Sequence, residues 1–123
     1  MKLLIVDDSN IIRSKIARAL GSRNLEVVGL ARNGHEAVSL FTRTRPDVVT
    51  MDLTMPEMDG IECIRRLLEL KPDTLILVVS ALADKATAIE ALKLGAQGFL
   101  CKPFSEQDLA EAVEELIKGA VHG

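Results

Sequence analysis

The chain has 123 residues, of which 48% are hydrophobic, 27% are charged and 2% are aromatic. A chain of this length and composition is typical of one globular domain with an aliphatic core. The formal net charge is −3 without a basic stripe, and no stretch approaches the roughly 18 apolar residues that span a bilayer. We therefore expect a cytoplasmic domain that binds proteins or small anions, with no direct nucleic-acid ligand and no membrane segment.

Five short apolar runs alternate with helical patterns along the chain. The runs have strand length and cover residues 3–6, 25–31, 47–51, 75–79 and 98–100. Several runs are apolar at nearly every position, which indicates strands covered on both faces, as in a parallel sheet. Strict alternation of strand and helix then predicts an α/β fold, a doubly wound (βα)5 three-layer sandwich with right-handed crossovers.

Apolar residues between the runs recur at helical spacing and predict amphipathic helices, each with one buried face. The residues expected on the buried faces are Ile12, Ile16, Ala19 and Leu20, then Ile61, Ile64, Leu67 and Leu68, then Ile89 and Leu92, and last Leu109, Val113, Leu116 and Ile117. The five units share no sequence similarity with one another. We therefore predict one domain over residues 1–123, with 119–123 as a tail outside the core.

Cap residues agree with these helices. Ser105 precedes the last helical pattern and Asp108 follows three residues later, which is a carboxylate variant of the capping box. Gly21, Gly95 and Gly119 are expected at helix ends.

Cysteine and histidine show no spacing typical of metal ligands. Cys63 and Cys101 lie far apart and form no CxxC motif. We expect both to be small buried hydrophobic residues rather than disulfide partners or zinc ligands. His35 and His122 are expected to be exposed to solvent.

Carboxylate, hydroxyl or ammonium side chains follow four of the five apolar runs. Asp7 and Asp8 follow the first run, Asp52 the third, Ser80 the fourth and Lys102 the fifth. In open α/β sheets, ligands bind beyond the carboxyl ends of the strands. A single Asp at such a position is most often a turn or cap residue. Three carboxylates, a hydroxyl and an ammonium at one rim predict a site for chemistry.

Three carboxylates in one small site repel one another, and a hard divalent cation would relieve that repulsion. Oxygen ligands without His or Cys indicate Mg²⁺, with Mn²⁺ as the alternative. Phosphoryl transfer depends mainly on positioning and charge neutralisation, which the cation and Lys102 would provide. A carboxylate oxygen of Asp52 would be the nucleophile and would form an aspartyl phosphate.

Four segments, LLIVDDS, DVVTMDLTMPEMDG, VVSA and GFLCKPF, resemble in this order the receiver domains of two-component signalling, the CheY-like family. The resemblance covers the whole chain and implies a flavodoxin-like, five-stranded sheet of order 2-1-3-4-5. It also implies a signalling switch that is not an enzyme. A histidine kinase or a small phosphodonor would phosphorylate it, and a downstream protein would read the signal, as in a stand-alone regulator of the chemotaxis type.

The resemblance also implies roles for individual residues at the metal. Asp52 would be the phosphoacceptor. Asp8 and Asp52 would ligate Mg²⁺ directly, with the backbone carbonyl of Thr54 as the third protein ligand. Asp7 would act mainly through a metal-bound water.

The resemblance implies a second set of residues that respond to phosphorylation. Ser80 would hydrogen-bond the phosphoryl group and Lys102 would pair with it, before a cis peptide bond to Pro103. Phe99 matches the aromatic residue that turns inward when Ser80 moves toward the phosphate. The surface of the fourth helix, the fifth strand and the fifth helix would carry the signal to a partner.

Two other functions fit the same residues less well. A phosphatase of the haloacid dehalogenase type would need a second Asp two residues after Asp52, where Thr54 stands. A flavin-binding module would need a Ser/Thr/Gly-rich phosphate loop after the first strand, and DDSNIIR is not one. The first Met and an end at the fifth helix favour a stand-alone regulator over a domain cut from a longer one. We expect a monomer or a weak, phosphorylation-dependent dimer.

Overall fold

The computed structural model describes residues 1–55 and 58–122. The elements are β1 Lys2–Val6, α1 Asn10–Gly21, β2 Glu26–Ala31, α2 Gly34–Thr44, β3 Val48–Met51, α3 Gly60–Leu70, β4 Leu75–Ala81, the 3-10 helix η1 Leu82–Asp84, α4 Lys85–Leu94, β5 Gly98–Lys102 and α5 Glu106–His122. The strands are parallel and lie in the order β2-β1-β3-β4-β5. The predicted α/β fold and sheet order are confirmed.

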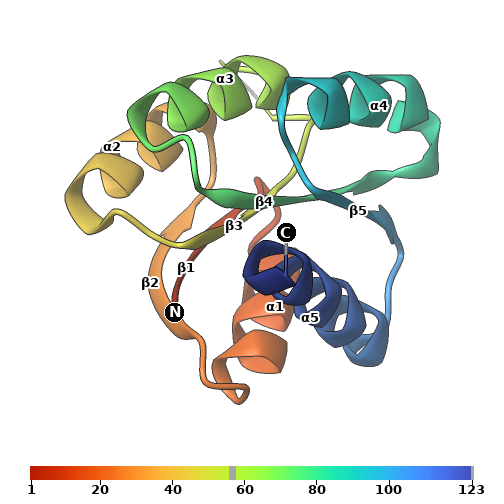
Figure 1. Ribbon diagram of the computed structural model, residues 1–123. Coiled ribbons are helices and arrows are strands. Elements are labelled where there is room, and N and C mark those ends of the chain that lie inside the picture. The colour runs from red at the N-terminus through yellow and green to blue at the C-terminus, as the bar shows by residue number, and fades with distance from the viewer. Residues whose placement is uncertain (56–57, 123) are drawn as a thin grey trace.

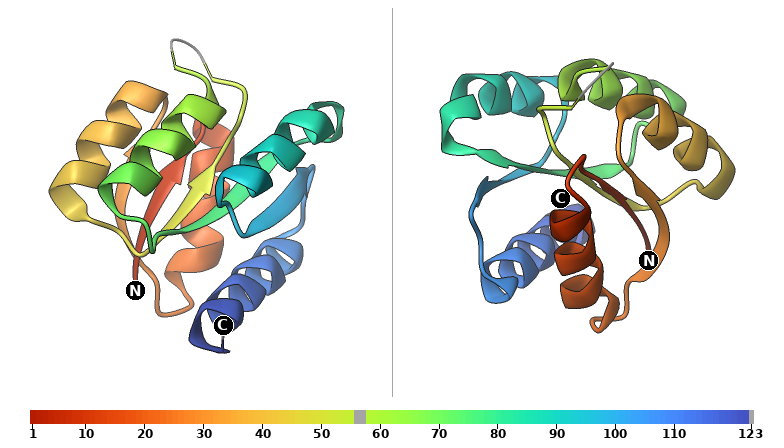
Figure 2. Two further views of the ribbon diagram at one scale, coloured as in Figure 1. Left: turned by 45° about the horizontal axis from the view of Figure 1, so that its top comes forward. Right: turned by 180° about the vertical axis from the view of Figure 1, so that it is seen from behind.

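Helices cover both faces of the sheet (Figure 1), and the two further views show the same three layers (Figure 2). On one face α2, α3 and α4 enclose a core that includes Phe41 and Ile64. On the other face α1 and α5 enclose a second core that includes Ile16 and Leu109. Because β1, β3 and β4 lie between these two cores, their side chains are buried on both faces, which explains the continuous apolar runs.

The buried face of α4 differs from the prediction. Ile89 and Leu92 are 46% and 41% exposed, whereas Ala88 and Ala91 face the core. Both pairs have the same spacing of three residues, so periodicity alone cannot choose between them. The structure packs the two small alanines against the sheet, so the prediction that Ile89 and Leu92 are buried is wrong.

Helix ends agree with two of the three predicted glycines. Gly21 is the last residue of α1, and Gly95 caps α4 with a φ of 131°, a conformation that favours glycine. Gly119 lies inside α5, which continues to His122 into the predicted tail, so its assignment to a helix end is wrong. At the start of α5 the capping box is confirmed, because Ser105 and Asp108 exchange hydrogen bonds of 3.1 and 3.0 Å between side chain and backbone.

The cysteines are both free thiols. Cys63 is buried as predicted, and burial raises the pKa of its thiol to about 12. Cys101 is only half-buried because β5 lies at the edge of the sheet, so the prediction of full burial is wrong there. His35 is exposed as predicted, and the side chain of His122 lies outside the described part.

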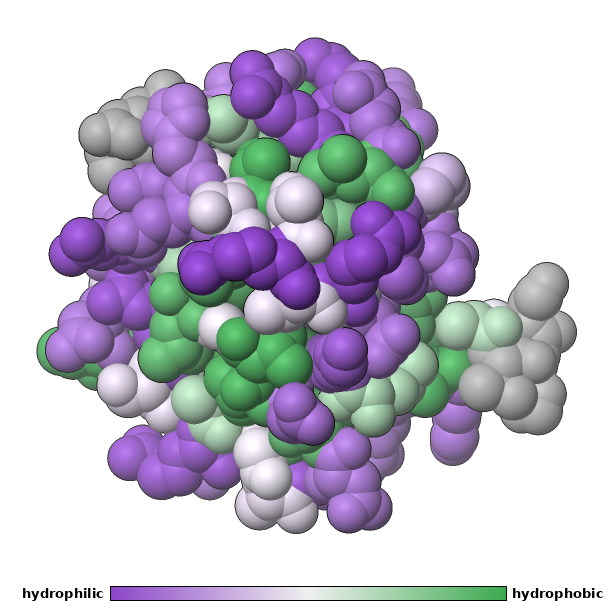
Figure 3. Space-filling model, turned by 90° about the vertical axis from the view of Figure 1, so that its left-hand side faces the viewer, coloured by the Kyte–Doolittle hydropathy of each residue, from purple (hydrophilic) through white to green (hydrophobic). Residues whose placement is uncertain are grey.

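The opposite edge of the sheet, β2, also leaves apolar surface in contact with solvent. Figure 3 shows hydrophobic residues gathered among hydrophilic ones on this side of the molecule. Leu30 is exposed, and together with Leu40, Glu36 and Arg43 it lines a shallow surface hollow. The register of β2 shifts where it pairs with β1. Such a bulge is typical of edge strands that do not pair with a strand of another molecule.

The core contains one polar group that a substitution should improve. Thr50 in β3 is 1% exposed, and its Oγ1 has no hydrogen-bond partner within the described residues. A buried unsatisfied hydroxyl costs about 1–3 kcal/mol, and valine has nearly the same shape as threonine. We expect Thr50→Val to raise the free energy of unfolding by about 1 kcal/mol, measured by urea denaturation.

The control for that substitution is Thr74→Val. Thr74 is also buried, but its hydroxyl donates a 2.7 Å hydrogen bond to the carbonyl of Lys71. Its replacement should lower stability, because the carbonyl loses a partner. A similar gain in both variants would contradict the explanation.

Candidate functional site

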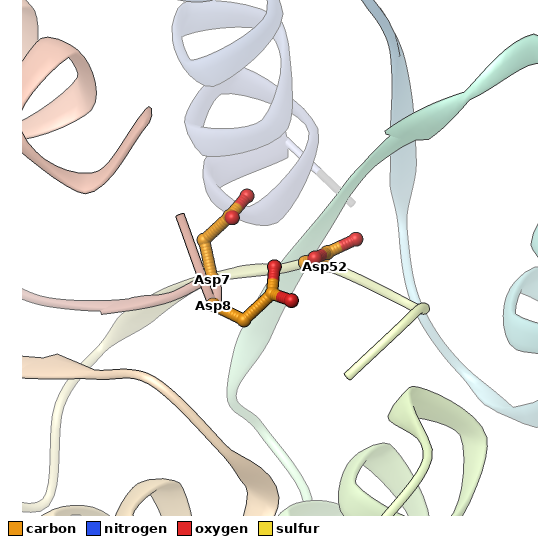
Figure 4. Close-up of side chains that lie close together, drawn as sticks. All are labelled: Asp7, Asp8 and Asp52. Atoms are coloured by element: carbon orange, nitrogen blue, oxygen red, sulfur yellow. The ribbon is translucent and has the colours of Figure 1, made fainter. Parts of the chain in front are cut away.

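The carboxyl ends of β1 and β3 hold three carboxylates side by side. Figure 4 shows Asp7 and Asp8 coming from the end of β1 and Asp52 from the end of β3. One carboxylate oxygen from each of the three residues lies within 4.8 Å of the other two. Backbone hydrogen bonds continue past the strand ends. The N–H of Asp7 donates to the carbonyl of Ala31 at 3.0 Å, and the N–H of Asp52 donates to the carbonyl of Val6 at 2.9 Å. The sheet itself therefore brings together the carboxylates that the sequence placed at one rim.

Lys102, the last residue of β5, reaches this acidic cluster. Its Nζ lies 2.8 Å from Oδ2 of Asp7 and 3.7 Å from Oδ1 of Asp52. The side chain is 22% exposed, so the ion pairs are only partly screened by water. The predicted cis bond to Pro103 is confirmed. One ammonium thus lies against two of the three carboxylates, which leaves the cluster with excess negative charge.

The negative charge of Asp52 is poorly stabilised. Burial raises the pKa of its carboxyl from 3.8 to about 6, and the negative charge of Asp7 adds to the rise. Lys102 and the backbone N–H of Thr54, 3.3 Å from Oδ1 of Asp52, act in the opposite direction. The carboxylate of Asp52 therefore has too few groups that stabilise its negative charge. Binding of a cation, or a covalent modification of the carboxylate, is favourable in such a site.

The residues present fit a hard divalent cation. All three side chains offer carboxylate oxygens, the ligands that Mg²⁺ and Mn²⁺ prefer. Asp7 and Asp52 are buried, whereas Asp8 is exposed, so the cluster is open to solvent on one side. The backbone of Thr54 lies close to this cluster, because its N–H donates a hydrogen bond to Oδ1 of Asp52.

Ser80 lies at the same rim but its hydroxyl is engaged elsewhere. It is fully buried near the end of β4, and its Oγ donates a 3.0 Å hydrogen bond to Oδ2 of Asp84. The hydroxyl of Thr54 donates to the same oxygen, at 3.1 Å. Sequence reasoning missed Asp84, because an Asp directly before a helical pattern indicates a helix cap. The structure shows that its side chain makes no capping hydrogen bond to α4.

Phe99 lies in β5, opposite Val78 of β4. It is half-buried and packs against the core beneath α2, α3 and α4. Its predicted inward turn concerns a second conformation, so that role stays a prediction.

Gly60, a second residue that sequence reasoning missed, seats α3 against the segment that carries Asp52. Its N–H donates a 3.1 Å hydrogen bond to Leu53. A Cβ at this position would lie 2.6 Å from Cα of Leu53 and 2.9 Å from the carbonyl oxygen of Asp52. The sequence shows Gly60 between Asp59 and a helical pattern, but this position does not reveal how closely Gly60 approaches the backbone of Leu53.

We expect Gly60→Ala to lower the free energy of unfolding by about 1–3 kcal/mol, because the methyl group meets backbone that cannot rotate away. Urea denaturation measures the loss. Gly21→Ala is the matched control, since a Cβ at Gly21 meets nothing within 4 Å. That variant should keep or slightly raise the stability. Equal effects at the two glycines would rule out the steric explanation.

The family is identified by comparison with known proteins. The family model of the response regulator receiver domain matches residues 3–114. The chain belongs to this family. The receiver domain is 41% identical over 117 residues to the chemotaxis protein CheY of Thermotoga maritima, an alignment that covers 95% of this chain and 98% of that protein. The relation supports two-component signalling as the setting of this chain.

Solved structures agree with the fold. The REC domain of AraT, a response regulator from Geobacillus stearothermophilus, has a TM-score of 0.91 at 35% identity and covers 98% of this chain and 95% of that one. A chain of the CheX-CheY-BeF3-Mg+2 complex from Borrelia burgdorferi has a TM-score of 0.89 at 29% identity, with coverage of 95% and 89%. Within residues 1–55 and 58–122, no helix is long and apolar enough to cross a membrane.

Proposed function

We propose that this receiver domain accepts a phosphoryl group on Asp52, from a histidine kinase or from a small phosphodonor. The observation that carries the proposal is the arrangement of Asp52 beside two further carboxylates, with Lys102 against the cluster. Asp52 is buried among negative charges, and a nucleophilic carboxylate needs a local cation to approach an anionic phosphodonor. The protein acts as a signalling switch rather than as an enzyme.

Asp8 and Asp52 are the residues that would hold Mg²⁺ directly, or Mn²⁺ in its place. The backbone carbonyl of Thr54 would be the third protein ligand, and Asp7 would contribute through a water. When bound, the cation supplies positive charge that offsets the carboxylates and the phosphoryl oxygens. The CheX-CheY complex from Borrelia burgdorferi was solved with Mg²⁺ and BeF3, which supports this assignment by analogy.

In the transfer step a carboxylate oxygen of Asp52 forms a bond to phosphorus. At the same time the P–N bond of a phosphohistidine breaks, or the P–O bond of acetyl phosphate. The electron pair of the broken bond leaves with the imidazole, which takes up a proton, or with acetate. The ammonium of Lys102 is close enough to Asp52 to pair with an oxygen of the transferred group.

Phosphorylation would then change the surface around β5, at one edge of the sheet. The new group carries roughly two negative charges, so Ser80 and Lys102 gain contacts in a second conformation in which Phe99 turns inward. The surface formed by α4, β5 and α5 would present that change to a downstream protein. We propose a cytoplasmic, stand-alone regulator of the chemotaxis type, monomeric or weakly dimeric after phosphorylation, with a receiver domain of a longer regulator as the alternative.

The test is incubation with acetyl phosphate and Mg²⁺, followed by intact mass measurement. We expect one phosphoryl group on the unsubstituted protein and none on Asp52→Asn. Asp59→Asn is a matched control, because Asp59 is an exposed carboxylate that caps α3, and it should still be modified. Modification of Asp52→Asn would overturn the assignment of the acceptor. Continuous release of phosphate without a stable adduct would favour a phosphatase.

A further inference from the structure

Asp84 joins three segments that meet beside the acceptor. Its Oδ2 accepts one hydrogen bond from Ser80, on β4, and one from Thr54, on the segment after β3. Asp84 itself is the last residue of η1, directly before α4. Thr54 also contacts the acceptor, because its backbone N–H donates to Asp52. One carboxylate oxygen thus ties the acceptor segment to the start of α4.

The bond to Asp84 uses the one proton of the Ser80 hydroxyl. A serine hydroxyl donates a single hydrogen bond, and Ser80 is fully buried. Hydrogen bonds to a carboxylate are stronger than those between neutral groups. While Asp84 accepts this proton, Ser80 cannot donate it to a phosphoryl oxygen on Asp52.

Asp84 also has an alternative set of donors. The helices α1, α2 and α3 are each capped by a side chain, from Ser9, Asn33 and Asp59 respectively. Asp84 stands at the corresponding position of α4, but its side chain makes no capping hydrogen bond. The first N–H groups of a helix have no partner within the helix and favour a carboxylate. Asp84 can therefore exchange one favourable set of donors for another.

We propose that Asp84 is a positioning residue that holds Ser80 in the unphosphorylated state and releases it when Asp52 is phosphorylated. This inference rests on the proposed function. A phosphoryl group competes for the proton of Ser80, and its negative charge repels the carboxylate of Asp84. The released carboxylate then caps α4. The hydrogen-bond exchange at Asp84 links the chemistry at Asp52 to the helix of the output surface.

The test uses beryllium fluoride with Mg²⁺ as the probe and isothermal titration calorimetry as the measurement. If the hold on Ser80 keeps the binding-competent form at about one tenth of the population, Asp84→Ala should bind beryllium fluoride about tenfold more tightly. Asp84→Asn, whose amide oxygen can still accept the hydrogen bond from Ser80 but carries no charge, is the second variant and should show a smaller gain. Asp59→Asn removes the same charge from the neighbouring loop and should leave the affinity unchanged.

A double-mutant cycle separates the proposed role from a general effect of charge. In a Ser80→Ala background the hydrogen bond to Asp84 no longer exists, so adding Asp84→Ala should produce a much smaller gain. The same gain with and without Ser80, a gain in Asp59→Asn, or unchanged binding in both Asp84 variants would overturn the inference. If the unsubstituted protein takes up neither acetyl phosphate nor beryllium fluoride, the proposed function fails and this inference fails with it.

Discussion

The Asp52→Asn variant will be more stable than the unsubstituted protein at pH 8 in the absence of divalent cations, by about 3 kcal/mol. The folded protein raises the pKa of Asp52 from 3.8 to about 6, chiefly by burial and then by the charge of Asp7. The folded state therefore binds the proton of Asp52 more tightly than the unfolded state does. Stability contributed by that proton is present at low pH and is lost as the pH rises through 3.8 to about 6.

The neutral amide of the Asp52→Asn variant carries no such penalty at high pH. Urea denaturation at a series of pH values, with a chelator present, should show the difference between the two proteins disappearing below about pH 4, where both side chains are neutral. Asp59→Asn serves as the control, because Asp59 is exposed and asparagine also caps a helix well. A difference that is largest at acidic pH would contradict the assignment of the raised pKa to Asp52.

Mg²⁺ should remove most of the difference in stability between the two proteins in the same experiment. A ligand that binds only the folded state stabilises it by about 2.7 kcal/mol at a hundred times its Kd. The unsubstituted protein should gain this stabilisation, whereas Asp52→Asn lacks one of the proposed ligands and should gain much less. Equal stabilisation of both proteins would place the cation elsewhere.

The second large effect is expected for Lys102→Met at pH 8 without divalent cations. Its ammonium lies against Asp7 and Asp52, which are both buried. Removal of one partner from a buried ion pair costs about 3–5 kcal/mol, because the remaining charges stay uncompensated. We expect a loss of about 3 kcal/mol in the free energy of unfolding. The loss should shrink near pH 5, where Asp52 takes up a proton, and in the presence of Mg²⁺.

Lys71→Met is the matched control for that variant. The side chains of Lys71 and Lys102 are similarly buried, at 17% and 22% exposed, and Lys71 also forms an ion pair, with Asp73 at 3.2 Å. Asp73 is largely exposed, so water compensates it when the lysine is removed. The loss should therefore be much smaller and unaffected by Mg²⁺. Similar losses in the two variants, or a loss for Lys102→Met that neither pH nor Mg²⁺ changes, would show that packing rather than charge is responsible.

The fold and the position of the site could be predicted from the order of residues along the chain. Apolar runs of strand length alternate with helical patterns. A parallel sheet covered by helices on both faces is the arrangement that buries these runs. The carboxyl ends of parallel strands meet at one edge, so residues that directly follow the runs share that edge. This reasoning was sufficient for Asp7, Asp8, Asp52 and Lys102, because backbone geometry places them whatever their side chains do.

The rest depended on tertiary packing. Ala88 and Ala91 have the same spacing as Ile89 and Leu92, so only contact with the sheet decides which pair is buried. The pKa of Asp52 depends on how completely neighbouring atoms exclude water, a property that spacing does not carry. In the sequence the position of Asp84 indicates a helix cap, and only the close approach of Ser80 and Thr54 in three dimensions turns its carboxylate toward the acceptor segment.

The sequence alone determined the sheet and its acidic edge, because both follow from periodicity and strand direction. Packing decided burial, charge balance and hydrogen-bond partners, because these depend on distances between atoms far apart in the chain.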